Sequence, residues 1–218
     1  MALKWSDLSF AWQVCLEEAW AAYCVGSLPI GAALLDEQGR LLLRERNHIA
    51  DPAPFGRVGN SQLAHAELNV LLQLNRAEVV PHSCTLYSIL EPCPLCMGAF
   101  YMSGVRALVY AARDPYAGST NLLGKTEYLS RKPIRVHGPE PAFEPLVIAF
   151  QVAAHAQRFD YQKWADFYAY WARISSSAEA HGRWLHDSGE LRAAADAGLD
   201  IMRVFDLLTP PEDEGGTA

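Results

Sequence analysis

Short β-prone apolar runs alternate with helix-like stripes from residue 6 to residue 136, and this alternation most restricts the folds open to the 218-residue chain. The strand-like runs are 30–35, 41–46, 85–90, 107–112 and a final one near 134–136. Helical spacing of apolar residues occupies 6–25, 64–74 and 93–103. Strands that alternate with helices predict an α/β sandwich, with helices on both faces of a mixed sheet.

Local signals place several boundaries within this pattern. Ser6 and Asp7 are the candidate N-caps of the first helix. The acidic, glycine-containing stretch 36–39 between the first two apolar runs predicts a β-hairpin. Residues 51–61 contain two prolines and two glycines, which predicts a loop.

The chain changes character near residue 146, after which the pattern is helical only. We therefore expect a main domain over 1–145, a helical C-terminal extension packed on it over 146–208, and a disordered acidic tail over 209–218. The serines at 175–177 predict a break between two helices of the extension.

Four aromatic residues recur at helical spacing in the extension: Trp164, Phe167, Tyr168 and Trp171. Their simplest role is to bury apolar area against the main domain. The alternative is that part of this aromatic face covers a substrate pocket or forms a dimer contact.

Charge and hydropathy bear on partners and location. The formal net charge is −7, from 18 Lys and Arg against 25 Asp and Glu, which argues against a protein that grips nucleic acid through many phosphates. No apolar run approaches the ~20 residues of a membrane span. Five cysteines and an acidic N-terminal stretch unlike a signal peptide predict a reducing, cytoplasmic location.

Two short motifs carry the chemistry: His65-Ala66-Glu67 and Pro92-Cys93-Pro94-Leu95-Cys96, each opening an expected helix. Cysteines three apart at a helix N-terminus can reach one ion, and the helix dipole there favours thiolates. Two sulfurs and one imidazole suit zinc, with a fourth position left for water, as in catalytic zinc sites. Glu67 beside such an ion is suited to moving protons during replacement of a ring amine by oxygen. This paired signature is typical of zinc deaminases.

Other functions for these residues remain open. The Cys93–Cys96 pair could be a redox dithiol, although that motif needs no distant His-x-Glu. It could also belong to a closed structural zinc site, with His82 or Cys84 as the fourth ligand. A closed structural zinc site would leave Glu67 without a chemical role.

With these motifs in view, residues 5–140 resemble the cytidine deaminase-like superfamily, in the branch of guanine deaminases and tRNA adenosine deaminases. The segments that carry the resemblance are 28–34, Asn47, 65–67, 90–99, 112–115 and 117–118. The resemblance implies a five-stranded mixed sheet flanked by helices, a zinc ion between two helix N-termini, and a homodimer.

Carried over to this sequence, the resemblance makes His65, Cys93 and Cys96 the zinc ligands and Glu67 the proton shuttle. Asn47 would hydrogen-bond the substrate, and its alternative role is a turn-forming amide. Backbone N–H groups of Ala66 and Glu67 would face the substrate. Asp114 would lie near a purine ring, and its alternative role is to cap the turn before Pro115.

Two departures favour a small substrate. Where tRNA adenosine deaminases usually carry Asp-Pro-Thr before the His-Ala-Glu motif, this chain has Ser61-Gln62-Leu63. Its C-terminal region is acidic and aromatic, not basic. We expect a small pocket closed by loop 51–62 and by the C-terminal helices.

The sequence thus predicts a zinc-dependent hydrolytic deaminase. Its substrate would be a free nucleobase, nucleoside or related aminated heterocycle, with guanine-like purines favoured. The alternatives are adenosine-to-inosine deamination of tRNA and a non-catalytic, zinc-stabilised interaction module. Nucleic acid is otherwise not expected as a partner, and neither is a membrane.

Overall fold

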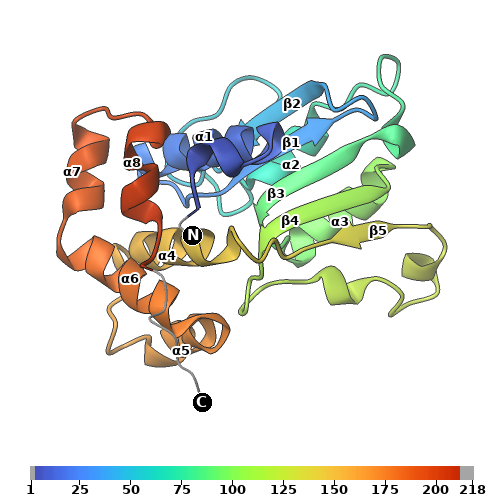
Figure 1. The fold of residues 1–218 in the computed structure, drawn as a ribbon. Helices are drawn as coiled ribbons and strands as arrows, with labels where there is room; N and C mark the ends of the chain where they lie inside the picture. Colours follow the sequence, from blue (N-terminus) through green and yellow to red (C-terminus); the bar gives the residue numbers. More distant parts are fainter. Residues whose placement is uncertain (1–2, 212–218) are drawn as a thin grey trace.

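The core of the protein is a five-stranded mixed sheet. Figure 1 shows its strands lying side by side, with β2 and β5 at the two edges. This computed structural model describes residues 3–211. The strands are β1 (Gly31–Leu35), β2 (Leu41–Arg46), β3 (Thr85–Leu90), β4 (Ala107–Ala112) and β5 (Arg135–His137), in the order β2-β1-β3-β4-β5. β1 is antiparallel to β2 and β3, whereas β3, β4 and β5 run parallel.

Helices account for most of the remaining regular structure. The α-helices are α1 (Phe10–Cys24), α2 (Ala66–Leu72), α3 (Pro94–Ser103), α4 (Glu144–Ala156), α5 (Ala165–Ile174), α6 (Ser176–Asp187), α7 (Glu190–Asp196) and α8 (Ile201–Leu208). Short 3-10 helices are η1 (Trp5–Asp7), η2 (Pro81–Ser83), η3 (Thr120–Leu122) and η4 (Tyr128–Ser130). Within residues 3–211, no helix combines the length and apolar character needed to cross a membrane.

The central part of the sheet is buried on both faces, as the alternation along β1 shows. Ala33 and Leu35 belong to a hydrophobic cluster with residues of α1 and α4. Ala32 and Leu34 point the other way and belong to a second cluster with residues of α2 and α3. The predicted α/β/α sandwich with a five-stranded mixed sheet is confirmed (Figure 1).

Helix α1 lies unusually close to β1 because the strand begins with glycine. A Cβ atom at residue 31 would lie 2.0 Å from the carbonyl oxygen of Cys15, which no larger residue could accommodate without moving the helix. The first helix starts later than expected, with Ser9 and not Ser6 or Asp7 at its N-cap. Residues 5–7 instead form η1, and the Asp7 carboxylate accepts a hydrogen bond from the backbone N–H of Lys4.

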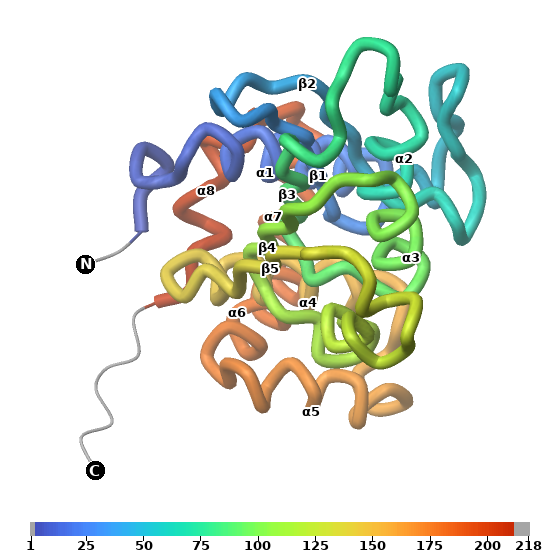
Figure 2. The backbone as a smooth tube through the Cα atoms, turned by 90° about the vertical axis from the view of Figure 1, so that its right-hand side faces the viewer, coloured from blue at the N-terminus to red at the C-terminus, as the bar shows by residue number. Residues whose placement is uncertain are grey.

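The C-terminal helices share the hydrophobic cluster of α1 and α4, through side chains such as Trp171 and Phe205. Ser175 caps α6, accepting a hydrogen bond from the backbone N–H of Ala178, so the predicted break at 175–177 is confirmed. The N-terminal turn lies near α8 in Figures 1 and 2, and the rings of Trp5 and Phe205 are 5.7 Å apart.

The domain limits stay predictions. Helix α4 begins at Glu144, next to the expected boundary at 145, and packs against β4 on one side and α6 on the other. Of the predicted tail over 209–218, only residues 209–211 lie within the described part of the chain.

Candidate active site

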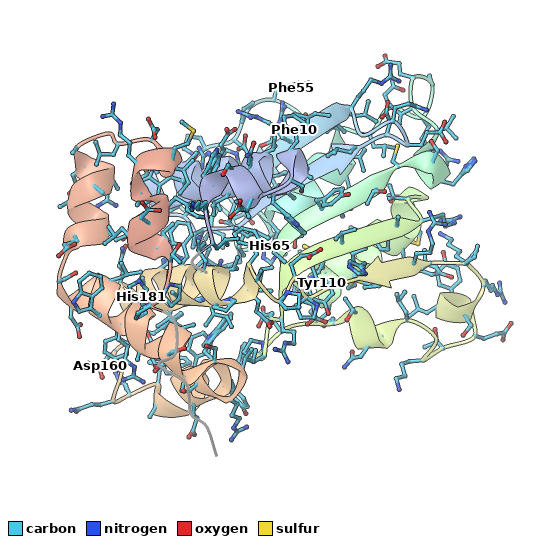
Figure 3. All side chains as sticks on the ribbon, viewed as in Figure 1. Phe10, Phe55, His65, Tyr110, Asp160 and His181 are labelled. Carbon is cyan, nitrogen blue, oxygen red and sulfur yellow. The ribbon has the colours of Figure 1, made fainter. Side chains whose placement is uncertain are left out.

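Two helix N-termini meet at one end of the sheet and bring the two motifs together. His65 is the N-cap of α2, and Cys93 is the N-cap of α3. The carbonyl oxygen of each accepts the first helical hydrogen bond, from Asn69 N–H and Met97 N–H respectively. Figure 3 shows His65 at the end of the sheet that adjoins the C-terminal helices.

The three predicted ligands have the spacing that a zinc ion needs. His65 Nδ1 lies 3.5 Å from Cys93 Sγ and 3.4 Å from Cys96 Sγ, and the three atoms lie within 4.8 Å of one another. Tetrahedral zinc, with Zn–S of about 2.3 Å and Zn–N of about 2.0 Å, places nitrogen and sulfur about 3.5 Å apart. The donor set therefore fits zinc.

The ligand thiols differ in protonation. A hydrogen bond from Cys96 lowers the pKa of the Cys93 thiol to about 4, and His65 acts in the same direction. The pKa of Cys96 is raised by that same hydrogen bond and by burial. The pKa of His65 is raised, chiefly by its hydrogen bond with Cys93. The lowered pKa of Cys93 favours its thiolate form, which is the form that binds a metal ion.

Glu67 is buried one helical position after Ala66, beside the ligands. Its Oε2 lies 3.4 Å from Cys96 Sγ, and its Oε1 lies 3.1 Å from the hydroxyl of Ser88 on β3. Burial raises the pKa of the Glu67 carboxyl, which moves it toward the range in which one group can both accept and donate a proton.

A cavity of about 170 Å³ opens beside His65, Glu67 and Cys93. Its apolar lining comes from α5 and from loops and strand ends of the sheet: Leu28, Ile30, Leu90, Tyr116, Ala117, Phe167 and Trp171. Its remaining polar lining is Glu91, Asp114, Gln151 and His155. Among the described residues, those that line the cavity include no Lys or Arg.

The predicted substrate-binding residues have different positions. Asp114 lines the cavity, and its Oδ1 also accepts hydrogen bonds from the N–H groups of Tyr116 and Ala117, so it caps the turn as well. Burial raises the pKa of its carboxyl. Ala66 is buried at the first position of α2, where a backbone N–H has no partner within the helix.

Asn47 is fully buried but is not among the residues that line the cavity. Its Oδ1 accepts a hydrogen bond from Ile49 N–H, as in the alternative turn-forming role. Within residues 3–211, its Nδ2 has no hydrogen-bond partner. Buried donors are usually paired, and the contact of Asn47 with a substrate stays a prediction.

Loop 51–62 does not line the cavity, so the expectation that it closes the pocket is wrong. Val58 exchanges two hydrogen bonds with the Asn69 side chain, and Arg57 pairs with Glu45. These contacts hold the loop against α2 and β2. Figure 3 shows Phe55, at the tip of this loop, far from His65.

Gln151 and His155 line the cavity from α4, although neither was expected from the sequence to be a site residue. Gln151 was detectable as the one polar residue in the apolar run 146–154. The aromatic face of the extension both buries apolar area and borders the cavity. Tyr168 is buried in the hydrophobic core, whereas Phe167 and Trp171 also line the cavity.

The alternative closed zinc site finds no geometric support in the described residues. The group of potential metal ligands around His65 includes neither His82 nor Cys84. The Cys84 thiol instead donates to the Val80 carbonyl oxygen. Cys93 and Cys96 are both free thiols, which is also the reduced form of a redox dithiol, so that role stays an alternative prediction.

Comparison with known proteins agrees with this site. Residues 6–112 match the family model described as the cytidine and deoxycytidylate deaminase zinc-binding region. The chain is 34% identical to the tRNA-specific adenosine deaminase of Bacillus subtilis over 110 residues, covering 50% of this chain and 63% of that protein. It is 26% identical to the guanine deaminase of the same organism over 141 residues, covering 64% and 81%.

Three further matches define the limits of this similarity. The solved guanine deaminase of Nitrosomonas europaea has a TM-score of 0.51 and 25% identity, covering 72% of this chain and 87% of that one. The tRNA(Ile)-lysidine synthases of Deinococcus radiodurans and Deinococcus deserti are matched over only 15% and 18% of their length. The chain belongs to the cytidine deaminase-like superfamily, in the family of cytidine and deoxycytidylate deaminase zinc-binding domains.

Proposed function

We propose that this protein is a zinc-dependent hydrolase that deaminates a small aminated heterocycle, with a free nucleobase as the preferred class and guanine-like purines favoured. Water replaces the exocyclic amine, giving the ring carbonyl and ammonia. The observation that carries this proposal is the shared cavity. His65, Glu67 and Cys93 open onto a space of about 170 Å³ that is lined by rings and carboxylates.

The size and charge of the cavity support a small substrate. An engineered cavity of roughly 150 Å³ binds benzene, so a space of this size suits one small ring system. Phosphate recognition relies on Lys and Arg side chains, and the described cavity lining has neither. An uncharged heterocycle fits better than a nucleotide.

The residues have separate roles in this proposal. His65, Cys93 and Cys96 would hold zinc, which when bound makes water nucleophilic near neutral pH. Glu67 takes the proton of the attacking water, transfers a proton to a ring nitrogen, and then protonates the departing amine. Asn47, Asp114 and the N–H of Ala66 would orient the ring. The raised pKa of Glu67 suits this double role.

An ammonia-release screen tests the proposal. The panel contains guanine, adenine, cytosine, their nucleosides and nucleotides, and aminated triazines, all with zinc-loaded protein. We expect turnover of at least one free base. The proposal fails if zinc-loaded protein releases ammonia from none of these compounds.

Deamination of adenosine in tRNA is a second candidate, because the B. subtilis relative at 34% identity is a tRNA-specific adenosine deaminase. Incubation with anticodon stem-loops distinguishes the two. If inosine forms in the stem-loops as fast as the best small compound is deaminated, tRNA deamination becomes the preferred function. A non-catalytic zinc module would show no turnover with either substrate type, and a protein side chain in the fourth zinc position.

A cytoplasmic location stays a prediction from the cysteine content. We also expect the protein to form a homodimer. Helices α2 and α3 expose apolar side chains, including Leu72, Leu95 and Met102. Exposed apolar groups of this kind are typical of interaction surfaces. Light scattering coupled to size-exclusion chromatography would give twice the chain mass if this is correct.

A further inference from the structure

One side of the cavity is built by the C-terminal helices, and we call it the α4–α5 wall: Gln151, His155, Phe167 and Trp171. These residues lie beyond residues 6–112, the part of the chain that matches the family model. The zinc ligands come from α2 and α3, on the other face of the sheet. The wall therefore lies outside the segment that the family model covers.

Three polar atoms of this wall are buried without a hydrogen-bond partner in the described structure: Gln151 Oε1, His155 Nδ1 and Trp171 Nε1. Only two other side-chain atoms of residues 3–211 share this condition, and one of them is Asn47 Nδ2. Folded proteins rarely leave such atoms unpaired, because desolvation then goes uncompensated. Gln151, His155 and Trp171 all line the same cavity, so a ligand bound there could supply the missing partners.

Two of these three atoms have a defined hydrogen-bonding role, as an acceptor or a donor. The Gln151 side-chain N–H donates to the carbonyl oxygen of Pro29 at 2.8 Å, and that oxygen can only accept. The free atom of Gln151 is therefore its oxygen, an acceptor. The indole N–H of Trp171 is a donor only. The wall thus presents one acceptor and one donor.

Aromatic rings surround His155 and keep it uncharged. The His155 ring centroid lies 4.9 Å from that of Phe167 and 6.4 Å from that of Trp171. Burial lowers the pKa of His155 to about 4, so the imidazole is neutral at physiological pH. Tyr116 meets Phe167 edge to face at 5.6 Å, which extends the aromatic lining.

We propose that the α4–α5 wall recognises the ring N–H and a ring acceptor of a free heteroaromatic base, with Gln151 Oε1 accepting and Trp171 Nε1 donating. This inference rests on the proposed function and narrows its substrate class. A sugar on the ring nitrogen removes the N–H and adds bulk for which a cavity of about 170 Å³ leaves little room. The wall therefore selects free bases over their nucleosides.

Equilibrium binding tests this selection without turnover. Isothermal titration calorimetry would use the zinc-loaded Glu67→Gln protein with guanine against 9-methylguanine, and cytosine against 1-methylcytosine. We expect at least one base to bind about tenfold or more tightly than its methylated form, the value of one good hydrogen bond. Equal binding within both pairs, or binding of neither base, overturns the inference.

Variants of the wall separate recognition from folding. In the same background, Gln151→Met and Trp171→Phe should each weaken binding of the preferred base about tenfold. Gln151→Met should change binding of the methylated compound less than twofold, because that compound has no N–H to lose. Trp184→Phe, at an exposed position on α6, is the matched control and should bind like the parent.

The outcomes distinguish this inference from the function on which it rests. If the wild-type protein deaminates a free base but neither wall variant alters binding, the wall has no recognition role and the proposed function stands. If no compound is deaminated, the proposed function fails. Thermal melts of each variant establish whether it is folded. If Gln151→Met proves unstable, Trp171→Phe still tests the wall, because this variant retains an aromatic ring in the core.

Discussion

The hydroxyl oxygen of Ser88 lies 3.1 Å from Oε1 of Glu67, and both groups are buried. The same hydroxyl lies 2.8 Å from the carbonyl oxygen of Leu90, which can only accept. Because Ser88 has one hydroxyl hydrogen, donation to Leu90 leaves its lone pairs facing Glu67. Ser88 can then accept a hydrogen bond from protonated Glu67, and by turning it can donate to the carboxylate.

We therefore expect Ser88→Ala to lower kcat about tenfold and to shift the pH profile of kcat, because a buried carboxyl loses its partner in both protonation states. Ser88→Thr keeps the hydroxyl and should retain most activity. Ser103→Ala removes a hydroxyl that donates to a carbonyl within α3 and is the control. An unchanged pH profile in Ser88→Ala would contradict this role.

Zinc binding should depend on Cys96 and not on Cys84. Removing a ligand should weaken zinc binding by more than the roughly 10- to 100-fold typical of changes around ligands. Metal analysis of purified Cys96→Ala should therefore show little zinc, whereas Cys84→Ala and His82→Ala should each retain one zinc per chain. Loss of zinc from Cys84→Ala would point to the closed structural site instead.

The position of α4 depends on close packing with α6 at Gly182. A Cβ atom there would lie 2.6 Å from the Ala149 carbonyl oxygen and 2.6 Å from Val152 Cβ. Gly182→Ala should lower the free energy of unfolding by about 1–3 kcal/mol, the usual cost of overpacking. It should also weaken substrate binding, because α4 carries Gln151.

Gly98→Ala is the matched control for this change. Gly98 lies inside α3, and an added Cβ would meet nothing within 4 Å. Alanine in an open helical position should stabilise the protein by about 0.5–1 kcal/mol. Urea unfolding of both variants measures the difference. Similar unfolding free energies for the two would contradict the packing argument.

Acid should destabilise the protein through Asp51. Burial favours a raised pKa, but hydrogen bonds from Arg46 and His48 outweigh it and lower the pKa of Asp51. A carboxyl whose folded pKa lies below its unfolded value of about 3.9 stabilises the fold above that pH, and this stability is lost as pH falls through the folded pKa.

Asp51→Asn should accordingly cost about 0.5–1.5 kcal/mol at pH 7, a value discounted because solvent partly screens Asp51, and the difference from wild type should shrink near pH 3. Urea unfolding at pH 7, 5 and 3 measures this trend. Glu127→Gln, which removes an exposed ion pair with Arg131, should cost under about 0.5 kcal/mol at each pH. A loss for Asp51→Asn that is equal at pH 7 and pH 3 would refute the linkage.

The strands and the metal ligands were predictable because their signals are local. The β-prone runs 85–90 and 107–112 coincide with β3 and β4, and the motif cysteines open α3 as expected. Ser9 replaced Ser6 and Asp7 as the N-cap because Asp7 hydrogen-bonds within its own short turn. A competing local bond of that kind leaves no trace in hydrophobic periodicity.

The cavity wall could not be predicted in the same way, because it depends on how distant segments pack. Gln151 is recognisable as a polar residue in an apolar run, but only the packing of α4 beside the sheet brings it to the cavity. Loop 51–62 was expected as a lid because the departures from tRNA adenosine deaminases favoured a small, closed pocket. The Asn69 amide holds it elsewhere, a contact that requires the folded α2.

Turnover and zinc content of Glu67→Gln, measured on the same preparation, test the central claim most directly. The substitution keeps the shape of the side chain and removes its ability to take a proton. General acid–base groups contribute about 10²- to 10⁴-fold, so we predict that ammonia release falls by at least about 100-fold while one zinc per chain remains bound. Retained turnover would show that another group moves the proton, and loss of zinc would show that Glu67 supports the metal.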